Sequence, residues 1–205
     1  IQDETSTQSQ RFNRCDIENF YIDDGMFFEK ADIVLHFGEY SRVEKSLESK
    51  EEFEKVVENN LTGTANVILK YIKYMSDALF FYAGSSTRFS YPSAYKQSPY
   101  AFTKYSNAEL VKALSSWGDY KTGIIYFYNV FGEGEESGDM GTVVGKFKEN
   151  YINGKKIKVY GGEQTRRFTY IGDVVRNITN LVLERLEYGL DGDELHGVGA
   201  LEHDA

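Results

Sequence analysis

Tyr100 and Lys104, four positions apart in SPYAFTK (98–104), could together form a centre for proton transfer. At this spacing two side chains share one face of a helix, so the lysine ammonium can lie near the phenol oxygen. A nearby positive charge favours the ionised form of a phenol, whose pKa is ordinarily about 10. The same spacing also occurs on exposed faces of ordinary amphipathic helices, so the pair alone is a weak signal.

The elements around this pair alternate between short apolar runs and helical patterns. Predicted strands are the runs at 31–38, 78–86 and 122–132, with a further short strand at 156–162. Apolar residues recur with helical spacing at about 50–75, 100–116, 141–153 and 172–187. This alternation predicts an α/β fold with a doubly wound parallel sheet.

Small and polar residues follow the predicted strands, as in HFGEYS, YAGSST and YNVFG. Ligands of doubly wound sheets bind outside the carboxyl ends of the strands, so these residues are candidates for a site. A nucleophile elbow at AGSST is excluded because the Gly-x-Ser-x-Gly frame is absent and no histidine is placed as its base. The alternative for Ser85, Ser86 and Thr87 is a polar loop that caps the following segment.

Composition excludes several classes of function. The net charge is −9 and no Lys/Arg cluster interleaves with aromatic residues, which disfavours nucleic acid as a partner. No apolar run approaches the roughly 20 residues of a membrane span, and no signal peptide is found, so we expect a cytoplasmic protein. Cys15 is the single cysteine, and His36, His196 and His203 have no ligand spacing, so no metal site is predicted. His36 lies within an apolar strand and is predicted to be a core residue.

Several motifs occur in an order that resembles the NAD-dependent epimerase/dehydratase family, extended short-chain dehydrogenase/reductases that act on nucleotide sugars. These motifs are CDIEN (15–19), DIVLHFGEYSRVEKSLE (32–48), ENNLTGTANVI (58–68), FYAGSSTRFS (81–90), SPYAFTK (98–104), YFYNVFG (126–132) and GEQTRRFTYIGDVV (162–175). The resemblance implies a Rossmann-like NAD-binding core over residues 1–132. Residues 133–205 would hold part of a smaller substrate-binding lobe and a returning strand and helix.

The resemblance also implies NAD as the cofactor. Asp3 would bond the adenosine ribose hydroxyls, and an acid there disfavours the 2′-phosphate of NADP. The other cofactor-binding residues it implies are Asp16 and Ile17 beside the adenine, Phe37, Gly38 and Glu39 along the pyrophosphate and ribose, and Phe127, Tyr100 and Lys104 toward the nicotinamide.

By the same resemblance Tyr100 would be the general base and then the general acid. Lys104 would lower the pKa of Tyr100 and bond the nicotinamide ribose. Ser85 would be the catalytic hydroxyl, with Ser86 and Thr87 as alternatives. The implied substrate-binding residues are Ser85, Ser86, Asn129, which would bond the nucleotide sugar, and Arg166, which would pair with its diphosphate. Asn60 is expected to be a structural hydrogen-bonding residue.

The chain departs from the family pattern at several positions. No glycine-rich phosphate loop is found, because GEGEESG (132–138) follows the wrong strand and its glutamates would repel a pyrophosphate. IQDETST (1–7) resembles the end of the second strand of the family, and the chain stops before the remainder of the substrate lobe, so we expect a fragment or a chain that lacks segments at both ends. Tyr126 stands where many relatives carry arginine, and Arg167 where they carry aspartate, which leaves the substrate open.

The choice among reactions depends on the residues after Ser85. Nucleotide-sugar 4,6-dehydratases of the family place an Asp-Glu pair there, whereas this chain has Ser86 and Thr87. The leading hypothesis is therefore a UDP-hexose 4-epimerase, with a heptose-nucleotide 6-epimerase or another nucleotide-sugar epimerase or dehydratase as the alternative. A hypothesis of another class is a non-catalytic, degenerate chain that acts as a binding partner. The helices near 56–75 and 100–116 are expected to form a homodimer.

Overall fold

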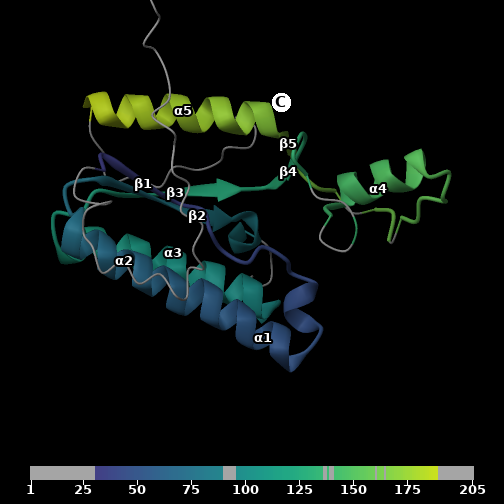
Figure 1. Ribbon diagram of the computed structural model, residues 1–205, viewed down its shortest axis with the longest axis horizontal. Helices are drawn as coiled ribbons and strands as arrows, with labels where there is room; N and C mark the ends of the chain where they lie inside the picture. The colour runs from purple at the N-terminus through teal and green to yellow at the C-terminus, as the bar shows by residue number, and fades with distance from the viewer. Residues whose placement is uncertain are drawn as a thin grey trace, which may run out of the picture.

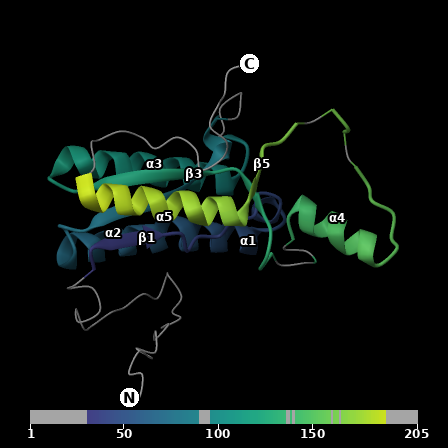
Figure 2. The same cartoon turned by 90° about the horizontal axis from the view of Figure 1, so that it is seen from above.

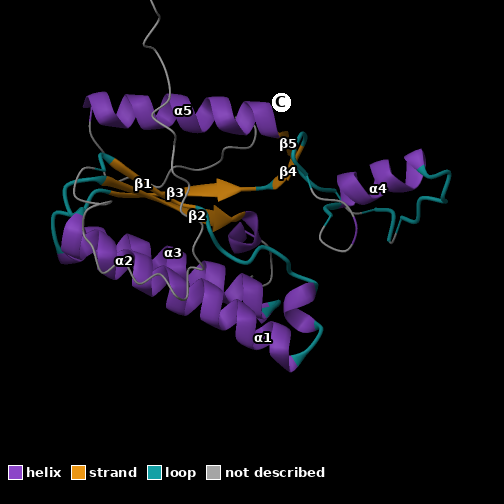
Figure 3. Ribbon diagram, viewed as in Figure 1, coloured by secondary structure: helices purple, strands orange, loops and turns teal. Residues whose placement is uncertain are grey.

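Three parallel strands make the central sheet of the computed structural model, which describes residues 31–89, 96–135, 138, 141–159, 161–163 and 165–188. The sheet order is β1 (Ile33–His36), β2 (Leu79–Ser85) and β3 (Thr122–Phe127), so β2 lies between the other two. Figures 1 and 3 show these strands as the middle layer of the molecule.

Helices cover both faces of this sheet. Helices α1 (Lys50–Val56), α2 (Gly63–Tyr74) and α3 (Pro99–Trp117) lie on one face, and α5 (Ile171–Tyr188) lies on the other (Figure 1). Parallel strands between two helical layers confirm the predicted doubly wound α/β fold. The returning helix predicted near 172–187 is α5, which packs against the same sheet as the rest of the core.

Strand β2 connects two apolar cores because successive side chains of a strand point to opposite faces. Phe80 and Tyr82 pack with Tyr71 and other residues of the layer formed by α2 and α3. Leu79 and Phe81 pack instead on the face covered by α5. Every residue of β2 is buried, which explains why its sequence is a continuous apolar run.

The helix predicted at 50–75 is interrupted by a π-helical turn, Val57–Thr62, between α1 and α2. It begins as a capped helix, since the Ser49 hydroxyl accepts a hydrogen bond from the backbone N–H of Glu52. The π-turn carries Asn60, whose fully buried amide binds the main chain of Tyr40 and the hydroxyl of Thr103. Asn60 is thus the structural hydrogen-bonding residue that the sequence predicts.

Two strand predictions need correction. The run 122–132 forms two strands, because β4 (Asn129–Phe131) leaves the central sheet and pairs with β5 (Phe168–Tyr170). The strand predicted at 156–162 is wrong within its described part, since residues 156–159 are exposed and no described strand pairs with them. Alternating apolar residues cannot form a strand without a partner for their backbone groups.

Beyond β4 and β5 lies α4 (Val143–Ile152), the helix predicted near 141–153 (Figure 2). Its first turn is capped by the Thr142 hydroxyl, which accepts a hydrogen bond from the backbone N–H of Gly145. Helix α4 and the small sheet β4–β5 therefore extend the molecule on the side where the central strands end.

Gly84 leaves no room for a side chain, which gives a test of the packing between β2 and β3. A Cβ atom there would lie 2.5 Å from Cδ1 of Tyr126 and 2.8 Å from Cγ2 of Ile124, both buried. Gly84→Ala should lower the free energy of unfolding by about 1–3 kcal/mol, because the core must shift to admit the methyl group. Urea denaturation measures this change. Gly38→Ala is the matched control, since no atom lies within 4 Å of its Cβ position; equal stability of both variants would contradict the packing.

Candidate active site

The carboxyl ends of β1, β2 and β3 lie at one edge of the sheet because the strands are parallel. Phe37 follows β1 and Phe127 ends β3, and their rings meet edge to face with centroids 5.4 Å apart. These two predicted cofactor residues are far apart in the sequence, and the fold brings them together at the edge where ligands of such sheets bind.

The start of α3 determines where Tyr100 lies. Ser98 caps the helix by accepting a hydrogen bond of 3.1 Å from the backbone N–H of Ala101, and Pro99 occupies the first turn. Tyr100 follows directly and is buried, and its own backbone N–H donates to the Ser46 hydroxyl. The capping sequence thus starts the helix at a point that turns Tyr100 inward.

Lys104 lies one turn later on α3 and is also buried, at 6% exposure. Its ammonium donates a 2.7 Å hydrogen bond to the carbonyl of Ala83 in β2 and forms an ion pair with the carboxylate of Glu39. It also lies 5.0 Å from the centroid of the Tyr82 ring. The ammonium is therefore fixed at the end of β2, two residues before Ser85.

The Glu39 carboxylate is turned into the space between the sheet and α3, with 1% of its side chain exposed. It accepts hydrogen bonds from the Tyr82 hydroxyl at 2.9 Å, the Thr64 hydroxyl at 2.5 Å and the Asn107 amide at 2.8 Å. We refer to Glu39, Thr64, Tyr82, Lys104 and Asn107 as the Glu39 cluster. Four donors from three elements satisfy a buried carboxylate, as burial of a charge requires.

Tyr82 can act only as a donor in this cluster. Burial, together with the negative charge of Glu39, raises the pKa of Tyr82 well above its ordinary value, so its phenol keeps its proton.

His36 of β1 adjoins the Glu39 cluster, and its Nε2 atom is 2.7 Å from the Thr64 hydroxyl. Because Thr64 gives its one hydroxyl proton to Glu39, the His36 Nε2–H must be the donor to Thr64. Burial lowers the pKa of His36 to about 4, while Glu39 acts in the opposite direction. His36 is thus a neutral core residue, as the sequence predicts.

Sequence reasoning did not identify Thr64, Tyr82 and Asn107 as parts of this site. Asn107 stands three residues after Lys104 and so shares its helix face, a spacing that could have revealed it. Its amide binds both Glu39 and the carbonyl of Asn60, each at 2.8 Å. Thr64 and Tyr82 lie within the motifs 58–68 and 81–90 that carry the resemblance, but neither residue type by itself indicates a buried polar cluster.

The predicted catalytic hydroxyl, Ser85, ends β2 and is buried. Its oxygen accepts hydrogen bonds from the backbone N–H and the hydroxyl of Thr87, at 3.3 and 3.0 Å. Ser86 and Thr87 belong to a 3₁₀ turn, Ser86–Phe89, which directly follows the strand. Thr87 therefore holds Ser85 in the described structure.

The predicted substrate residues Asn129 and Arg166 lie near the small sheet. The Asn129 amide donates to the carbonyl of Arg167 at 2.9 Å, beside the pairing of β4 with β5. Arg166 is exposed; its guanidinium donates to the carbonyl of Thr165 and also lines a cavity.

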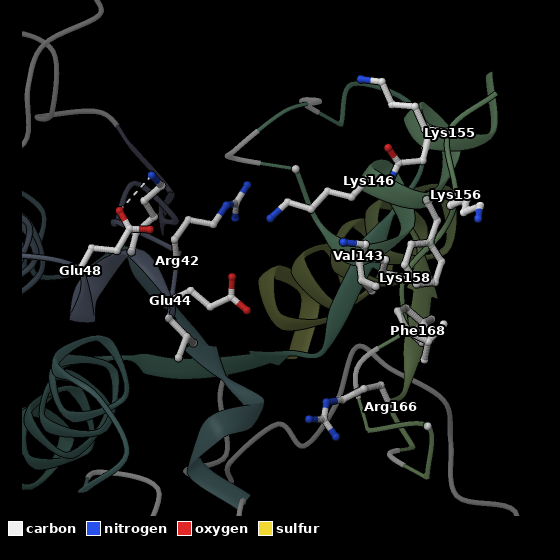
Figure 4. Close-up of a pocket in the computed structure, with 17 residues that line it drawn as sticks. Arg42, Glu44, Glu48, Val143, Lys146, Lys155, Lys156, Lys158, Arg166 and Phe168 are labelled. Atoms are coloured by element: carbon white, nitrogen blue, oxygen red, sulfur yellow. Dashed lines mark hydrogen bonds and ion pairs between the residues drawn. The ribbon is translucent and has the colours of Figure 1, made fainter. Parts of the chain in front are cut away.

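This cavity has a volume of about 1040 Å³ and lies between the segment 42–48, α4 and the segment 155–168 (Figure 4). Seven basic and two acidic side chains line it: Arg42, Lys45, Lys146, Lys155, Lys156, Lys158, Arg166, Glu44 and Glu48. Arg42 and Lys146 point into the space between its walls (Figure 4). A cavity lined mainly by cations in a chain of net charge −9 is suited to an anionic ligand.

The sequence did not predict this cavity because three distant segments form it, although the run GKKIKV (154–159) shows where three of its lysines lie. The predicted cofactor residues Asp3, Asp16 and Ile17 lie outside the described residues. Within the described ranges, no His, Cys, Asp and Glu side chains gather in threes or more as metal ligands. None of the helices in that part of the chain has the length and apolar character needed to span a membrane.

Comparison with known proteins adds independent information on this chain. The NAD dependent epimerase/dehydratase family matches residues 2–194. Protein CapI of Staphylococcus aureus is 26% identical over 182 residues, which cover 83% of this chain and 53% of that protein. The chain spans about half the length of the curated relatives it matches.

Solved structures that share the fold include two nucleotide-sugar epimerases. One is UDP-glucuronic acid 4-epimerase from Bacillus cereus in complex with UDP-glucuronic acid and NAD, with 23% identity and a TM-score of 0.70 over 82% of this chain and 54% of that chain. The other is UDP-N-acetylglucosamine 4-epimerase from Methanobrevibacter ruminantium in complex with UDP-N-acetylmuramic acid, with 21% identity and a TM-score of 0.67 over 78% of this chain and 54% of that chain.

The neutral state of His36 predicts a pH dependence of stability. As the pH falls below about 6.5 the unfolded chain binds a proton at His36, whereas the folded protein binds it only near pH 4. The free energy of unfolding should therefore decrease as the pH falls from about 6.5 to about 4, by about 3 kcal/mol from this residue. Urea denaturation of the wild type and of His36→Gln at several pH values isolates the contribution of His36 to the free energy of unfolding. An identical pH dependence of both proteins would contradict it.

Proposed function

The chain belongs to the NAD-dependent epimerase/dehydratase family, and we propose that it acts as a UDP-hexose 4-epimerase with NAD as its cofactor. The observation that carries the proposal is the placement of Lys104, whose ammonium is fixed at the end of β2, two residues before Ser85 and one helical turn after Tyr100. Tyrosine, lysine and serine are the groups that the transfer of a hydroxyl proton would use.

The strand ends fit the proposed cofactor in two respects. An ammonium has three N–H donors, and Glu39 and Ala83 account for two, so one remains for a ribose hydroxyl. Phe37 is 38% exposed and meets Phe127 edge to face, which offers an aromatic surface at the same edge. When bound, NAD supplies the hydride acceptor and donor that interconvert a sugar alcohol and its ketone.

In the proposed reaction this chain moves the proton. Tyr100 takes the hydroxyl proton of the sugar at its phenol oxygen and later returns it, acting first as base and then as acid. Ser85 donates its hydroxyl proton to the reacting sugar oxygen, because the hydrogen bonds from Thr87 use only its acceptor positions.

The cationic cavity supports a nucleotide diphosphate as the anionic part of the substrate. Arg166 presents a planar fork that matches phosphate oxygens, and the lysines of the segment 155–158 add charge beside it. An epimerase is favoured over a 4,6-dehydratase because Ser86 and Thr87 stand where those dehydratases carry an Asp-Glu pair for the loss of water.

Tyr100→Phe tests the reaction because it removes the phenol oxygen and keeps the ring. We expect kcat in the full-length protein to fall by at least about 10²-fold, the usual size of a general acid–base contribution, with NAD affinity nearly unchanged. The assay follows the interconversion of UDP-glucose and UDP-galactose. Tyr188→Phe is the matched control, because Tyr188 is 76% exposed at the end of α5.

Near-normal epimerisation by Tyr100→Phe would refute the mechanism. A wild type that is inactive on UDP-hexoses but active on a heptose nucleotide would change the substrate only. A wild type inactive on every nucleotide sugar would favour the non-catalytic binding partner.

The role of the cavity is tested by Lys158→Ala and Arg166→Ala. Each should raise KM for the UDP-hexose by roughly tenfold, since a hydrogen bond to a charged group contributes about 1.5–3 kcal/mol. The rise should be largest at low ionic strength, where exposed charges are least screened. Lys73→Ala, an exposed lysine of α2, is the matched control. Steady-state kinetics in which both cavity variants keep the wild-type KM would contradict this role.

A further inference from the structure

The turn that follows β2, Ser86–Phe89, is fastened to two other elements through Arg88. The Arg88 guanidinium donates a 2.6 Å hydrogen bond to the Glu109 carboxylate of α3, and 18% of the arginine side chain is exposed. Its Cζ atom lies 5.1 Å from the centroid of the Tyr105 ring and 5.9 Å from that of the Tyr126 ring. Arg88 thus joins the turn to α3 and to β3.

The ring of Tyr126 is a fixed point for this contact. It is fully buried, and it covers Gly84 so closely that a Cβ atom there would lie 2.5 Å from its Cδ1 atom. Phe89 meets the same ring edge to face, with centroids 4.9 Å apart. The chain therefore leaves this ring at Gly84 and returns to it with Arg88 and Phe89.

Thr87 lies in the turn between Ser85 and Arg88, and it gives both of its donors to the Ser85 oxygen. A hydroxyl oxygen has two acceptor positions and one proton. Because the backbone N–H and the hydroxyl of Thr87 fill the acceptor positions, the Ser85 hydroxyl can only donate to a further group. This arrangement exists only while the turn keeps the two donors within hydrogen-bond distance, at 3.3 and 3.0 Å.

We infer that Arg88 is a positioning residue of the proposed reaction: by anchoring the turn it holds Thr87 against Ser85, whose proton then points to the substrate oxygen. This inference rests on the proposed role of Ser85 as the hydroxyl that contacts the substrate. A serine with open acceptor positions could accept a hydrogen bond from the sugar hydroxyl and so compete with Tyr100 for its proton. The anchored turn removes Ser85 as a competing acceptor.

The contacts of Arg88 differ from those of an ordinary surface ion pair. The pair between Arg176 and Asp173 joins two residues of one helix, α5, and its arginine is 69% exposed. Such pairs contribute little, because water and salt screen them. Arg88 is mostly covered, reaches a residue 21 positions away and places its planar group over two aromatic rings. These contacts are suited to fix the turn that carries Thr87.

Arg88→Met in the full-length protein tests the inference, because methionine keeps an unbranched side chain and loses the guanidinium. We expect kcat for the interconversion of UDP-glucose and UDP-galactose to fall by roughly fivefold to tenfold, the effect of about one neutral hydrogen bond, with KM and NAD affinity nearly unchanged. In a Ser85→Ala background the same change should lower kcat no further, because both changes act through one hydroxyl. Arg176→Met is the matched control.

Thr87→Val tests the contact through which Arg88 acts. Valine lacks the hydroxyl donor and keeps the backbone N–H, so kcat should fall to a similar extent. Thr87→Ser restores the hydroxyl and should return kcat to near the wild-type value. Thr62→Val, at an exposed threonine of the π-helical turn, is the control. A Thr87→Val protein with wild-type kcat would overturn the inference, because Ser85 would then act equally well with an open acceptor position.

Amide hydrogen exchange, followed by NMR of the ¹⁵N-labelled full-length protein, reports on the anchor without catalysis. The backbone N–H of Thr87 is protected by its hydrogen bond to Ser85. It should exchange at least about tenfold faster in Arg88→Met than in the wild type, because the turn opens more often. If Arg88→Met does not fold, Glu109→Gln takes its place, since glutamine keeps the shape, loses the ion pair and should raise the exchange rate in the same direction.

Either of two results for Arg88 would overturn its role. One is an unchanged exchange rate at Thr87 in the variant. The other is an equal fall of kcat in the wild-type and Ser85→Ala backgrounds, since Arg88 would then be a structural residue. Faster exchange at Thr87 in a protein that converts no nucleotide sugar would support the anchor and refute the proposed function.

Discussion

The buried ion pair between Glu39 and Lys104 is the constraint on which the arrangement of the site depends. A carboxylate at this depth requires hydrogen-bond donors on every side, and the sequence supplies them from three elements. Each donor fixes the position of the element that carries it. The hydrogen bond from Thr64 holds α2 at the end of β1, and the hydrogen bonds from Asn107 hold α3 at the end of β1 and at the π-helical turn that carries Asn60. Polar contacts, as well as apolar packing, therefore determine how the helices on this face lie against the sheet.

The two faces of the sheet carry different chemistry at their carboxyl ends. On the face covered by α2 and α3, the Glu39 cluster lies among buried aromatic residues, so its electrostatic interactions are strong. On the α5 face, Phe37 and Phe127 extend the apolar core to a partly exposed surface. Strand β2 separates the two, because its alternating side chains belong to different cores. A ligand at this edge would meet an apolar surface and a fixed charge pair at once.

The sequence predicts the parts of this structure that depend on local pattern. Strand β2 is a continuous apolar run, and SPYAFTK contains both the cap that starts α3 and the tyrosine and lysine of its first turns. It does not predict where β3 ends and β4 begins, because that break depends on pairing with β5, a strand of three residues. The segment 156–159 is the opposite case. Its alternating apolar residues predict a strand, but the segment is exposed and no described strand pairs with it.

The sequence does not predict the orientation of the Glu39 side chain, because this orientation also depends on contacts with residues that are distant in the sequence. A residue in the loop after a strand can turn toward a ligand or toward the core, and only the positions of Tyr82, Thr64 and Asn107 decide between these. The resemblance places Glu39 along the cofactor, whereas its carboxylate is buried against Lys104 in the structure.

Charge is used in opposite ways at the two parts of the site. In the Glu39 cluster the charges are paired, buried and inaccessible to salt, so their field is constant over ordinary solution conditions. In the cavity seven cations face only two carboxylates in an open space, so their field extends into solvent and is screened as salt is added. The attraction of the cavity for an anion should thus weaken as salt is added, whereas the interaction between Glu39 and Lys104 should not, because one set of charges is open to solvent and the other is buried.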